Sequence, residues 1–213
     1  MDLTQQMKVW NGEFGKEYTD RNPQTVESLN FIYKNRYGVT RTAMNADFLG
    51  GLPKDIKILE VGCNVGTQLK CLQQIGLKNL HGIELQPYAV GLSKELTKDI
   101  NIIEGSAFDI PFENESFDLV FTSGLLIHIS PKDIDNVLDE IYRCSKKYIW
   151  GFEYYSKDWL VINYREKDDL LWKADYCQLF MDRFSTLEII KKQLFKYKDN
   201  DNQDKMFLLK KEN

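Results

Sequence analysis

The chain has 213 residues, of which 43% are hydrophobic and 13% aromatic, with a formal net charge of −4. This composition excludes a disordered or fibrous protein and suits one compact domain with a full core. The basic residues form no run that could follow a phosphate backbone, which disfavours a nucleic acid as partner.

The N-terminus and the cysteines indicate a soluble, cytoplasmic protein. The first 15 residues have no basic start followed by an apolar stretch, and no segment approaches the roughly 18 apolar residues of a membrane span. The four cysteines stand singly, so the sequence encodes neither a disulfide framework nor a zinc knuckle. We expect reduced, buried thiols and no membrane partner, and the oligomeric state is left open.

Residues 1–52 predict a helical lead-in or lid. The stretch "NPQTVESLNFIYKNRYG" begins with a proline turn, carries apolar residues at helical spacing and stops at Gly38. Tyr18 and Arg21 stand just before this stretch.

From residue 57 onward, apolar runs such as "KILEV", "NLHGIEL", "INIIEG", "FDLVFTS" and "KYIWGFEYY" alternate with amphipathic segments. This alternation predicts a doubly wound, mostly parallel α/β sheet. Residues 186–213 contain two strand-like runs separated by "KDNDNQD", which predicts an antiparallel C-terminal hairpin. We predict a single domain, 1–213, with a core over 56–150 and a cover segment over 153–185.

The turn in "IKILEVGCNVGTQLKCL" follows the first predicted strand, where a sheet of this type binds its ligands. A nicotinamide fingerprint needs glycines where this chain has Asn64 and Thr67. The turn therefore does not predict a pyrophosphate site.

The remaining pattern, E-x-G-x-x-x-G followed by an acid after the next strand, fits S-adenosylmethionine (SAM). Gly62 and Gly66 allow the backbone to approach the cofactor, Glu60 can bind its ammonium group, and Glu84 can accept both ribose hydroxyls. Two glycines that serve only packing are the alternative, and an acid at Glu84 would also suit NAD.

"NIIEGSAFDIPFENESFDLVFTSGLLIHI" suggests where an adenine ring would lie. Phe108 can cover one face of the ring, and a backbone N–H at Ala107 or Phe108 can reach its nitrogens. Ordinary packing is the alternative for each residue taken singly.

The motifs "LEVGCNVG", "GIELQPYAV", "GSAFDIPF" and "FDLVFTSGLLIHI" resemble the class I SAM-dependent methyltransferases over residues 56–150. With "WNGEFGKEYTDRN", "IYRCSKKYI" and "EYYSKDWLVINYREKDDLLWKADY", the chain is similar to the pseudaminic acid biosynthesis-associated methylases. The resemblance implies a seven-stranded Rossmann-like sheet with a reversed last strand, SAM as cofactor, and a sugar or sugar-derived acid of a surface-glycan pathway as methyl acceptor.

Two positions depart from the broad class. Asn64 occupies the usual middle glycine, and Ser106 stands where many members carry an aspartate that pairs with the adenine amino group. The resemblance also implies that Tyr18 or Arg21 reaches the carboxylate of the cofactor, although simple capping of the sheet edge would explain both. The predicted cofactor-binding residues are Tyr18, Arg21, Glu60, Gly62, Asn64, Gly66, Glu84, Leu85, Ser106, Ala107, Phe108 and Ser123.

Methyl transfer needs alignment, exclusion of water and, for a hydroxyl acceptor, removal of a proton. His128 follows the fourth predicted strand and is the candidate base, with a structural histidine as the alternative. His81 lies away from the ligand edge and is predicted to be structural. The two histidines have no carboxylate at ligand spacing, so no metal site is expected.

Residues 153–176 are rich in aromatic and charged side chains, which suits a cover over the acceptor. Tyr154 and Tyr155 are predicted as walls or proton partners. Tyr164, Arg165 and Lys173 are predicted to bind the acceptor, the two cations by anchoring a carboxylate or phosphate. A solvated helix with aromatic side chains packed beneath it is the alternative.

A competing hypothesis is a short-chain dehydrogenase that uses NAD(P), because Tyr142 and Lys146 have Y-x-x-x-K spacing. Such enzymes need a glycine where this chain has Gln68. In addition, "YRCSKKYIW" is typical of a helix end entering a strand. A SAM-dependent transferase acting on a small polar acceptor, with no nucleic acid partner, is therefore the leading interpretation.

Overall fold

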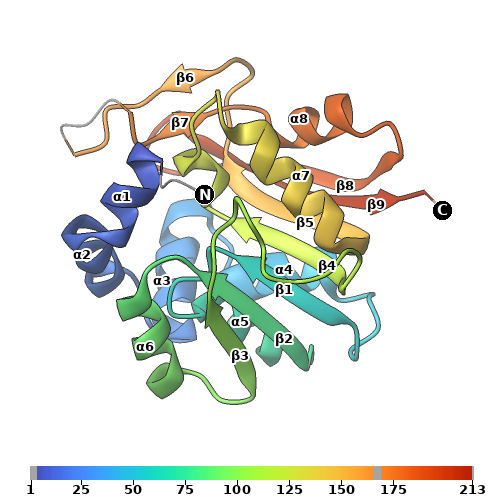
Figure 1. Cartoon of the computed structure of the whole chain (residues 1–213), viewed down its shortest axis with the longest axis horizontal. Helices are drawn as coiled ribbons and strands as arrows, with labels where there is room; N and C mark the ends of the chain where they lie inside the picture. The colour runs from blue at the N-terminus through green and yellow to red at the C-terminus, as the bar shows by residue number, and fades with distance from the viewer. Residues whose placement is uncertain (1–3, 166–168, 213) are drawn as a thin grey trace.

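The computed structural model of the chain describes residues 4–165 and 169–212. Seven strands form one sheet in the order β3-β2-β1-β4-β5-β9-β8 (Figure 1). These strands are β1 (Lys57–Val61), β2 (Asn79–Glu84), β3 (Ile100–Glu104), β4 (Phe117–Ser123), β5 (Ser145–Tyr154), β8 (Leu187–Lys196) and β9 (Gln203–Lys211). The helices are α1 (Gln5–Asn11), α2 (Glu13–Arg21), α3 (Val26–Tyr37), α4 (Arg41–Leu49), α5 (Thr67–Gln74), α6 (Pro87–Leu96), α7 (Ile134–Cys144) and α8 (Tyr176–Arg183).

The pairing of the strands confirms the predicted sheet. β1 to β5 pair in parallel, whereas β9 lies antiparallel between β5 and β8. Parallel strands need a crossover that covers a face of the sheet, and the apolar runs supply buried side chains on both faces. The C-terminal hairpin is antiparallel, as its short polar turn predicted.

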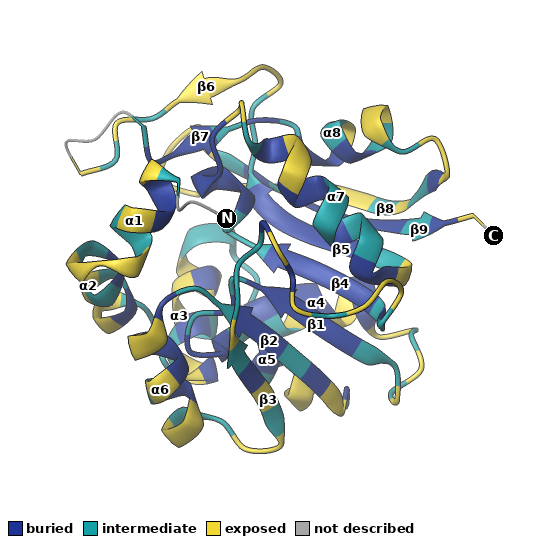
Figure 2. Cartoon of the chain, in the orientation of Figure 1, coloured by how far each residue is buried: buried dark blue, intermediate teal, exposed yellow. Residues whose placement is uncertain are grey.

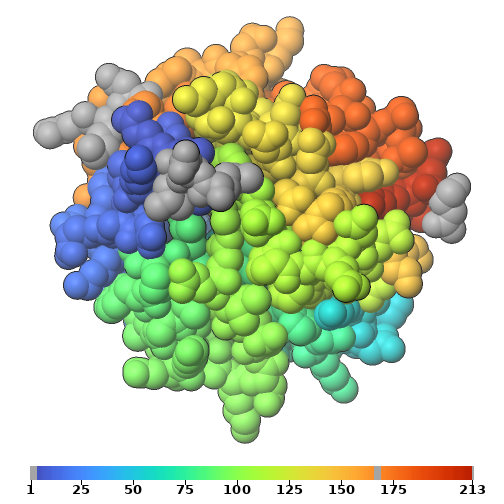
Figure 3. Space-filling view, viewed as in Figure 1, coloured from blue at the N-terminus to red at the C-terminus, as the bar shows by residue number. Residues whose placement is uncertain are grey.

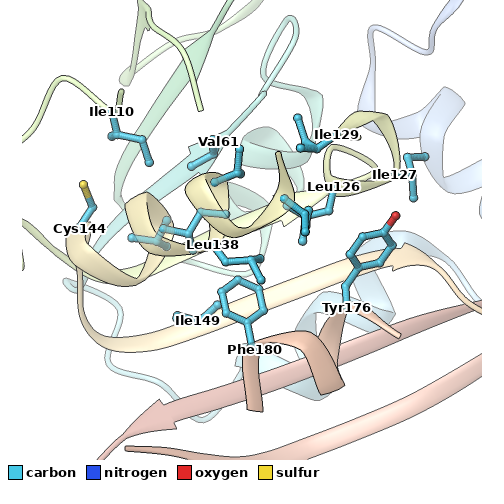
Figure 4. Close-up of a cluster of buried hydrophobic side chains, with 14 of the residues drawn as sticks. Val61, Ile110, Leu126, Ile127, Ile129, Leu138, Cys144, Ile149, Tyr176 and Phe180 are labelled. Carbon is cyan, nitrogen blue, oxygen red and sulfur yellow. The ribbon is translucent and has the colours of Figure 1, made fainter. Parts of the chain in front are cut away.

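Two hydrophobic clusters lie on opposite faces of the central sheet, and Figure 2 shows the buried strands between exposed helix surfaces. One cluster joins the sheet to α7 and α8, and Figure 4 shows Leu138, Phe180 and Ile149 within it. The other joins it to α3, α4 and α5. In β1, Leu59 belongs to the first cluster and Ile58 to the second, which is why both neighbouring positions of this strand are apolar.

The N-terminal helices form as their sequence predicts. α3 begins with a capping box, in which Thr25 accepts from the backbone of Ser28 and the Ser28 side chain accepts from the backbone of Thr25. It ends at Gly38, whose φ of +83° is the left-handed conformation that glycine adopts without a steric penalty. In Figure 1, α1 and α2 lie beside the sheet edge where the parallel strands end.

The cover segment contains structure that local sequence does not announce. Within 153–185, β6 (Leu160–Val161) and β7 (Trp172–Lys173) pair antiparallel, and α8 follows. Strands of two residues are too short to show an alternating pattern.

All four cysteines are free and buried, as expected. Among the described residues, none of the helices has the length and apolar character needed to cross a bilayer.

The reversal of the last strand decides what reaches the ligand edge. Because β9 runs antiparallel to β5, its first residues lie beside the last residues of β5, with Asp204 opposite Tyr154. The start of β9 and the turn before it therefore share an edge with the carboxyl ends of β1 to β5.

Candidate active site

A cavity of about 410 Å³ opens at the carboxyl edge of the sheet. Its walls come from α1, α2 and α3, from the turns after β1, β2, β3 and β4, and from the starts of the cover segment and β9. In Figure 3 the N-terminal helices, in blue, lie directly against the green segments of the core. Volumes of this size are typical of small-molecule and cofactor sites.

Most of the predicted site residues line this one cavity, although they come from distant parts of the chain. The lining includes Tyr18, Glu60, Gly62, Asn64, Glu84, Leu85, Ser106, Ala107, Phe108, Ser123, His128, Tyr154 and Tyr164. The topology brings them together, because the ends of parallel strands meet at a single edge.

The glycine turn needs two left-handed residues at Gly62 and Gly66, with φ of +72° and +77°. A Cβ at Gly62 would lie 2.7 Å from a methyl carbon of Leu125, and one at Gly66 would lie 2.6 Å from a methyl carbon of Ile102. Gly66 does not line the cavity. It serves the backbone turn and helix packing, whereas only Gly62 faces the space where a cofactor would lie.

Asn64 is left-handed as well, with φ of +48°, a conformation that asparagine tolerates better than most residues. Asn64 was predicted to bind the cofactor, but its side chain forms hydrogen bonds within the chain. Nδ2 donates to Thr19 Oγ1 in α2 at 3.0 Å, and Oδ1 accepts from the backbone N–H of Val65 at 2.8 Å. The amide therefore ties the glycine turn to the lid helix.

Replacing Asn64 by glycine preserves the left-handed backbone and removes this tie. We expect SAM affinity to fall by about 3- to 10-fold, because one neutral hydrogen bond contributes about 1 kcal/mol. Calorimetric titration with SAM measures the change, and hydrogen exchange should report faster opening of α2. Unchanged affinity and exchange would mean that only the backbone of Asn64 matters.

Glu60 presents an unsatisfied carboxylate oxygen to the cavity. The side chain is 2% exposed, and Oε2 has no hydrogen-bond partner among the described residues. Burial raises its pKa well above the ordinary value, which the positive charge of Arg41 opposes. A cationic ligand group would reverse this effect, since it stabilises the ionised carboxylate.

Arg41 is fully buried beneath this end of the cavity. Its guanidinium donates hydrogen bonds to Asn45 Oδ1 at 2.9 Å, to the Tyr33 hydroxyl at 3.1 Å and to Ser123 Oγ at 3.2 Å. Among the described residues, no carboxylate lies within ion-pair distance of it. It holds Ser123 at the end of β4 and supplies positive charge near Glu60.

Glu84 closes the turn from the neighbouring strand. Its Oε2 accepts from the backbone N–H of Asn64 at 2.8 Å, and its Oε1 accepts from that of Gln86 at 2.9 Å. Burial raises the pKa of Glu84, although these backbone hydrogen bonds act in the opposite direction. The carboxylate, which has about four acceptor positions, still has room to accept from a ligand hydroxyl.

Ser106 and Phe108 line the cavity from the turn after β3. The backbone N–H of Phe108 donates to Ser106 Oγ at 3.1 Å, so this amide is already used. Ala107 is then the better placed of the two amides predicted to meet a ring nitrogen, because it lines the cavity and has no hydrogen bond within the described chain.

His128 lies in a cage of aromatic rings at the lid. Its ring centroid is 4.3 Å from that of Trp10, 6.4 Å from Tyr18 and 5.9 Å from Tyr164. Nδ1 donates to the carbonyl oxygen of Leu170 at 2.8 Å, which fixes the tautomer with Nε2 as acceptor. Burial lowers the pKa of His128 to about 4, so the ring is neutral at pH 7 and has little driving force to take a proton.

The lowered pKa of His128 also predicts a dependence of stability on pH. The unfolded state binds a proton near pH 6.5 and the folded state only near pH 4, so folding stability is lost as pH falls between these values. Between pH 7.5 and 5 this contribution amounts to about 2 kcal/mol. Urea unfolding of the parent and of His128→Gln at both pH values isolates it, and equal pH dependence in the two proteins would contradict the assignment.

Besides Gly66, four predicted site residues do not reach the cavity lining. Arg21 pairs with Glu17 on the surface of α2 at 3.5 Å, and Lys173 donates to Asn202. The ring of Tyr155 lies under the ammonium of Lys205, and Arg165 is exposed. Residue type and proximity in sequence suggested these positions, but their side chains leave the backbone in other directions.

The lining also contains residues that were not anticipated from the sequence, among them Arg36, Tyr37 and Asp204. Arg36 and Tyr37 end α3, and Asp204 starts β9. The predicted reversal of the last strand could have identified Asp204, because it places the residues after the turn at the ligand edge. Among the described residues that line the cavity, Arg36 is the only arginine or lysine.

The dehydrogenase hypothesis fails on position. Tyr142 stacks on Phe184, and its hydroxyl bonds Thr186 at the opposite side of the molecule, while Lys146 lies in β5. Neither residue lines the cavity. Among the described residues, no group of three His, Cys, Asp or Glu side chains is placed to hold a metal ion.

The residues present fit SAM on the evidence of their unsatisfied groups. Of the buried polar side-chain atoms without a partner in the described chain, three belong to lining residues: Trp10 Nε1, Glu60 Oε2 and Gln68 Oε1. A ligand with an ammonium group and several hydroxyls can satisfy such atoms, and an apolar ligand cannot.

Comparison with known proteins agrees with this geometry. Residues 59–148 match the family described as "Methyltransferase domain". The chain is 27% identical over 126 residues to sterol 24-C-methyltransferase ERG6B of Gibberella zeae, covering 56% of this chain and 32% of that protein. It is 30% identical over 78 residues to the ubiquinone/menaquinone biosynthesis C-methyltransferase UbiE of Campylobacter jejuni, covering 34% and 33%. The matches thus span about a third of these relatives.

The fold extends the likeness to the whole chain. The structure of Burkholderia thailandensis 1,6-didemethyltoxoflavin-N1-methyltransferase, solved with bound 1,6-didemethyltoxoflavin and S-adenosylhomocysteine, superposes with a TM-score of 0.71 at 14% identity, covering 100% of this chain and 93% of that one. The matched segment spans less than half of the chain, and the seven-stranded sheet has the Rossmann-like methyltransferase fold of this neighbour.

Proposed function

We propose that the protein transfers the methyl group of SAM to a hydroxyl of a small polar acceptor, of the sugar or sugar-acid type. The observation that carries this proposal is the composition of the cavity. One end has the glycine turn between Glu60 and Glu84, and the other has Arg36, Tyr37, Tyr154 and Asp204. Because the two ends present different polar groups, the first suits the cofactor and the second suits the acceptor.

The first end supplies the groups that would hold the cofactor. Glu60 would receive the ammonium group, Glu84 the ribose hydroxyls, and Ala107 and Phe108 the adenine. Tyr18 lines the cavity from α2 and is our proposed partner for the carboxylate, in preference to Arg21. When bound, SAM supplies an electrophilic methyl group. The protein aligns the acceptor with it and excludes water.

The polar end is distinct from the matched methyltransferase segment. The family match covers residues 59–148, whereas Arg36, Tyr37, Tyr154 and Asp204 all lie outside it. The acceptors in the names of the relatives, a sterol and quinones, therefore carry little information about this end. Several hydrogen-bonding groups and one guanidinium favour a hydroxylated acceptor, and the guanidinium favours one that bears a carboxylate.

The likeness to pseudaminic acid-associated methylases in the sequence motifs supports the same acceptor class. Tyr164 lines the cavity beside Phe14, with ring centroids 6.0 Å apart, and would form the wall between the lid and the acceptor. A cytoplasmic location and catalysis without a metal ion are parts of this proposal.

Calorimetric titration with SAM, S-adenosylhomocysteine, NAD and NADP tests the cofactor. We expect micromolar binding of the first two and none of the others, and tight NADP binding without SAM binding would contradict the proposal. Mass spectrometry of reactions with SAM then tests the acceptor on N-acetylneuraminic acid, D-glucuronic acid and N-acetylglucosamine. A gain of one methyl group on a sugar supports the acceptor class.

A further inference from the structure

The polar end of the cavity contains a buried carboxylate with an unusual set of partners. Asp204 is 1% exposed. Its Oδ2 accepts from the Tyr37 hydroxyl in a short hydrogen bond and from the Tyr197 hydroxyl at 3.2 Å. Its Oδ1 has only a long contact of 3.4 Å with the same Tyr197 hydroxyl. One carboxylate oxygen is therefore held firmly, the other has no short hydrogen bond among those to the described chain, and Asp204 is among the residues that line the cavity.

No cation neutralises this carboxylate at close range. Among the described residues, Asp204 forms no ion pair, and the groups that face it are mostly phenols. They come from every element packed around it: Tyr33, Arg36 and Tyr37 of α3, Tyr154 of β5, Lys173 of β7 and Tyr197 of the turn before β9. Arg36 itself stacks on Tyr197, with its guanidinium carbon 4.9 Å from the ring centroid.

Such a site can exchange a proton near neutral pH. Burial raises the pKa of Asp204 to about 6, although the hydrogen bonds from Tyr37 and Tyr197 and the charges of Arg36 and Lys173 act to lower it. Burying a carboxylate away from a cation costs several kcal/mol, so a purely structural role would be served as well by an asparagine. The neutral His128, by contrast, is a poor proton acceptor.

A chain of contacts joins this carboxylate to the cofactor end. The amide of Gly124, after β4, donates to the carbonyl oxygen of Phe152 at 2.9 Å. The ring of Phe152 lies 6.0 Å from that of Tyr37, which bonds Asp204. All four residues line the cavity, so the space is continuous from the end of β4 to β9.

We propose that Asp204 accepts the proton of the acceptor hydroxyl, and that Tyr37 and Tyr197 hold its carboxylate in position. This assignment rests on the proposed function. As the C–O bond to the methyl group forms, the C–S bond breaks and its electron pair stays on sulfur. The hydroxyl proton passes to Asp204 Oδ1. The products are the methyl ether, S-adenosylhomocysteine and a protonated Asp204, which returns its proton to solvent. An acceptor with a free hydroxyl is thereby selected.

The first test needs no acceptor. Protein labelled with ¹³C at the aspartate carboxyl groups and saturated with S-adenosylhomocysteine is titrated by NMR, with the Asp204 signal identified by its loss in Asp204→Asn. We expect a midpoint near pH 6 in the parent and a higher midpoint in Tyr37→Phe, because a hydrogen bond that stabilises the carboxylate is lost. An Asp204 signal that stays ionised below pH 4.5, or protonated above pH 8, would overturn the assignment.

The second test measures turnover with the three sugar probes. Asp204→Asn should lower kcat by about 100-fold or more, as is typical for loss of a general base, with the Kd for SAM unchanged within about two-fold. The parent rate should rise with pH through about 6 because the carboxylate must be ionised, and this limb should vanish in the variant. Asp201→Asn, an exposed residue of the same turn, is the matched control and should behave as the parent.

The outcomes separate the two proposals. Full activity of Asp204→Asn with an unchanged pH limb overturns the role of Asp204 and leaves the proposed function intact. A parent protein that binds SAM but methylates none of the three sugars contradicts the proposed acceptor class, and with it the proton transfer. A parent that does not bind SAM contradicts the cofactor. Equal thermal stability of parent and Asp204→Asn, together with lost turnover, excludes a purely structural role.

Discussion

Replacing Glu60 by glutamine is expected to weaken SAM binding by about 10- to 100-fold, because a hydrogen bond to a charged group contributes about 1.5–3 kcal/mol. Glu60 Oε2 has no hydrogen-bond partner within the described chain, so the substitution breaks no hydrogen bond of this atom. Burial raises the pKa of Glu60, and the cofactor ammonium would lower it again. SAM affinity should therefore increase with pH in the parent, and this increase should be absent in Glu60→Gln.

Calorimetry at several pH values and in two buffers of different ionisation enthalpy measures both the affinity and the proton released. Glu104→Gln is the matched control, since Glu104 pairs in register with Glu84 at the same sheet edge but is exposed and does not line the cavity. Equal SAM affinity in all three proteins would mean that the ammonium group binds elsewhere. A substitution of Glu84 would be harder to interpret, because its carboxylate also accepts hydrogen bonds from the backbone N–H groups of Asn64 and Gln86 and so supports the turn itself.

The largest effect on stability is expected for Gly151→Ala. Gly151 of β5 lies opposite Phe207 of β9, and a Cβ at this position would lie 2.2, 2.5 and 2.9 Å from three carbons of the Phe207 ring. Phe207 is 1% exposed in the core, so it has little room to move away. Overpacking of this severity should lower the free energy of unfolding by about 3 kcal/mol or more.

Gly91→Ala provides the control in the opposite direction. Gly91 lies in α6, and a Cβ there has no heavy atom within 4 Å. Alanine has the higher helix propensity, so a gain of about 0.5–1 kcal/mol is expected. Urea unfolding of the three proteins measures both changes. Equal stability of Gly151→Ala and the parent would show that β5 and β9 can separate at little cost.

The candidate site has one end that could be predicted from the sequence and another that could not. The first end of the cavity could be predicted because Glu60, the glycine turn and Glu84 are each tied to the end of a strand that the sequence reveals. The second end could not, because Arg36, Tyr37 and Asp204 are close only after a helix and the last hairpin have packed together. The sequence also did not reveal which residues face the cavity: Gly66 does not line it, and Arg21 pairs with Glu17 on the surface of α2.

By itself, the sequence determined the alternation of helices and strands over residues 56–150, the mostly parallel sheet and the acid-flanked turn, since periodicity, turn residues and motif spacing are local properties. Tertiary structure alone decided that Asn64 ties the turn to Thr19, that His128 is a buried neutral ring, and that Asp204 faces the cavity between two phenols. Three of these contacts, Asn64 with Thr19, His128 with Leu170 and Tyr37 with Asp204, join residues 42 to 167 positions apart. Such contacts form only when the chain closes long loops, and no local pattern records them.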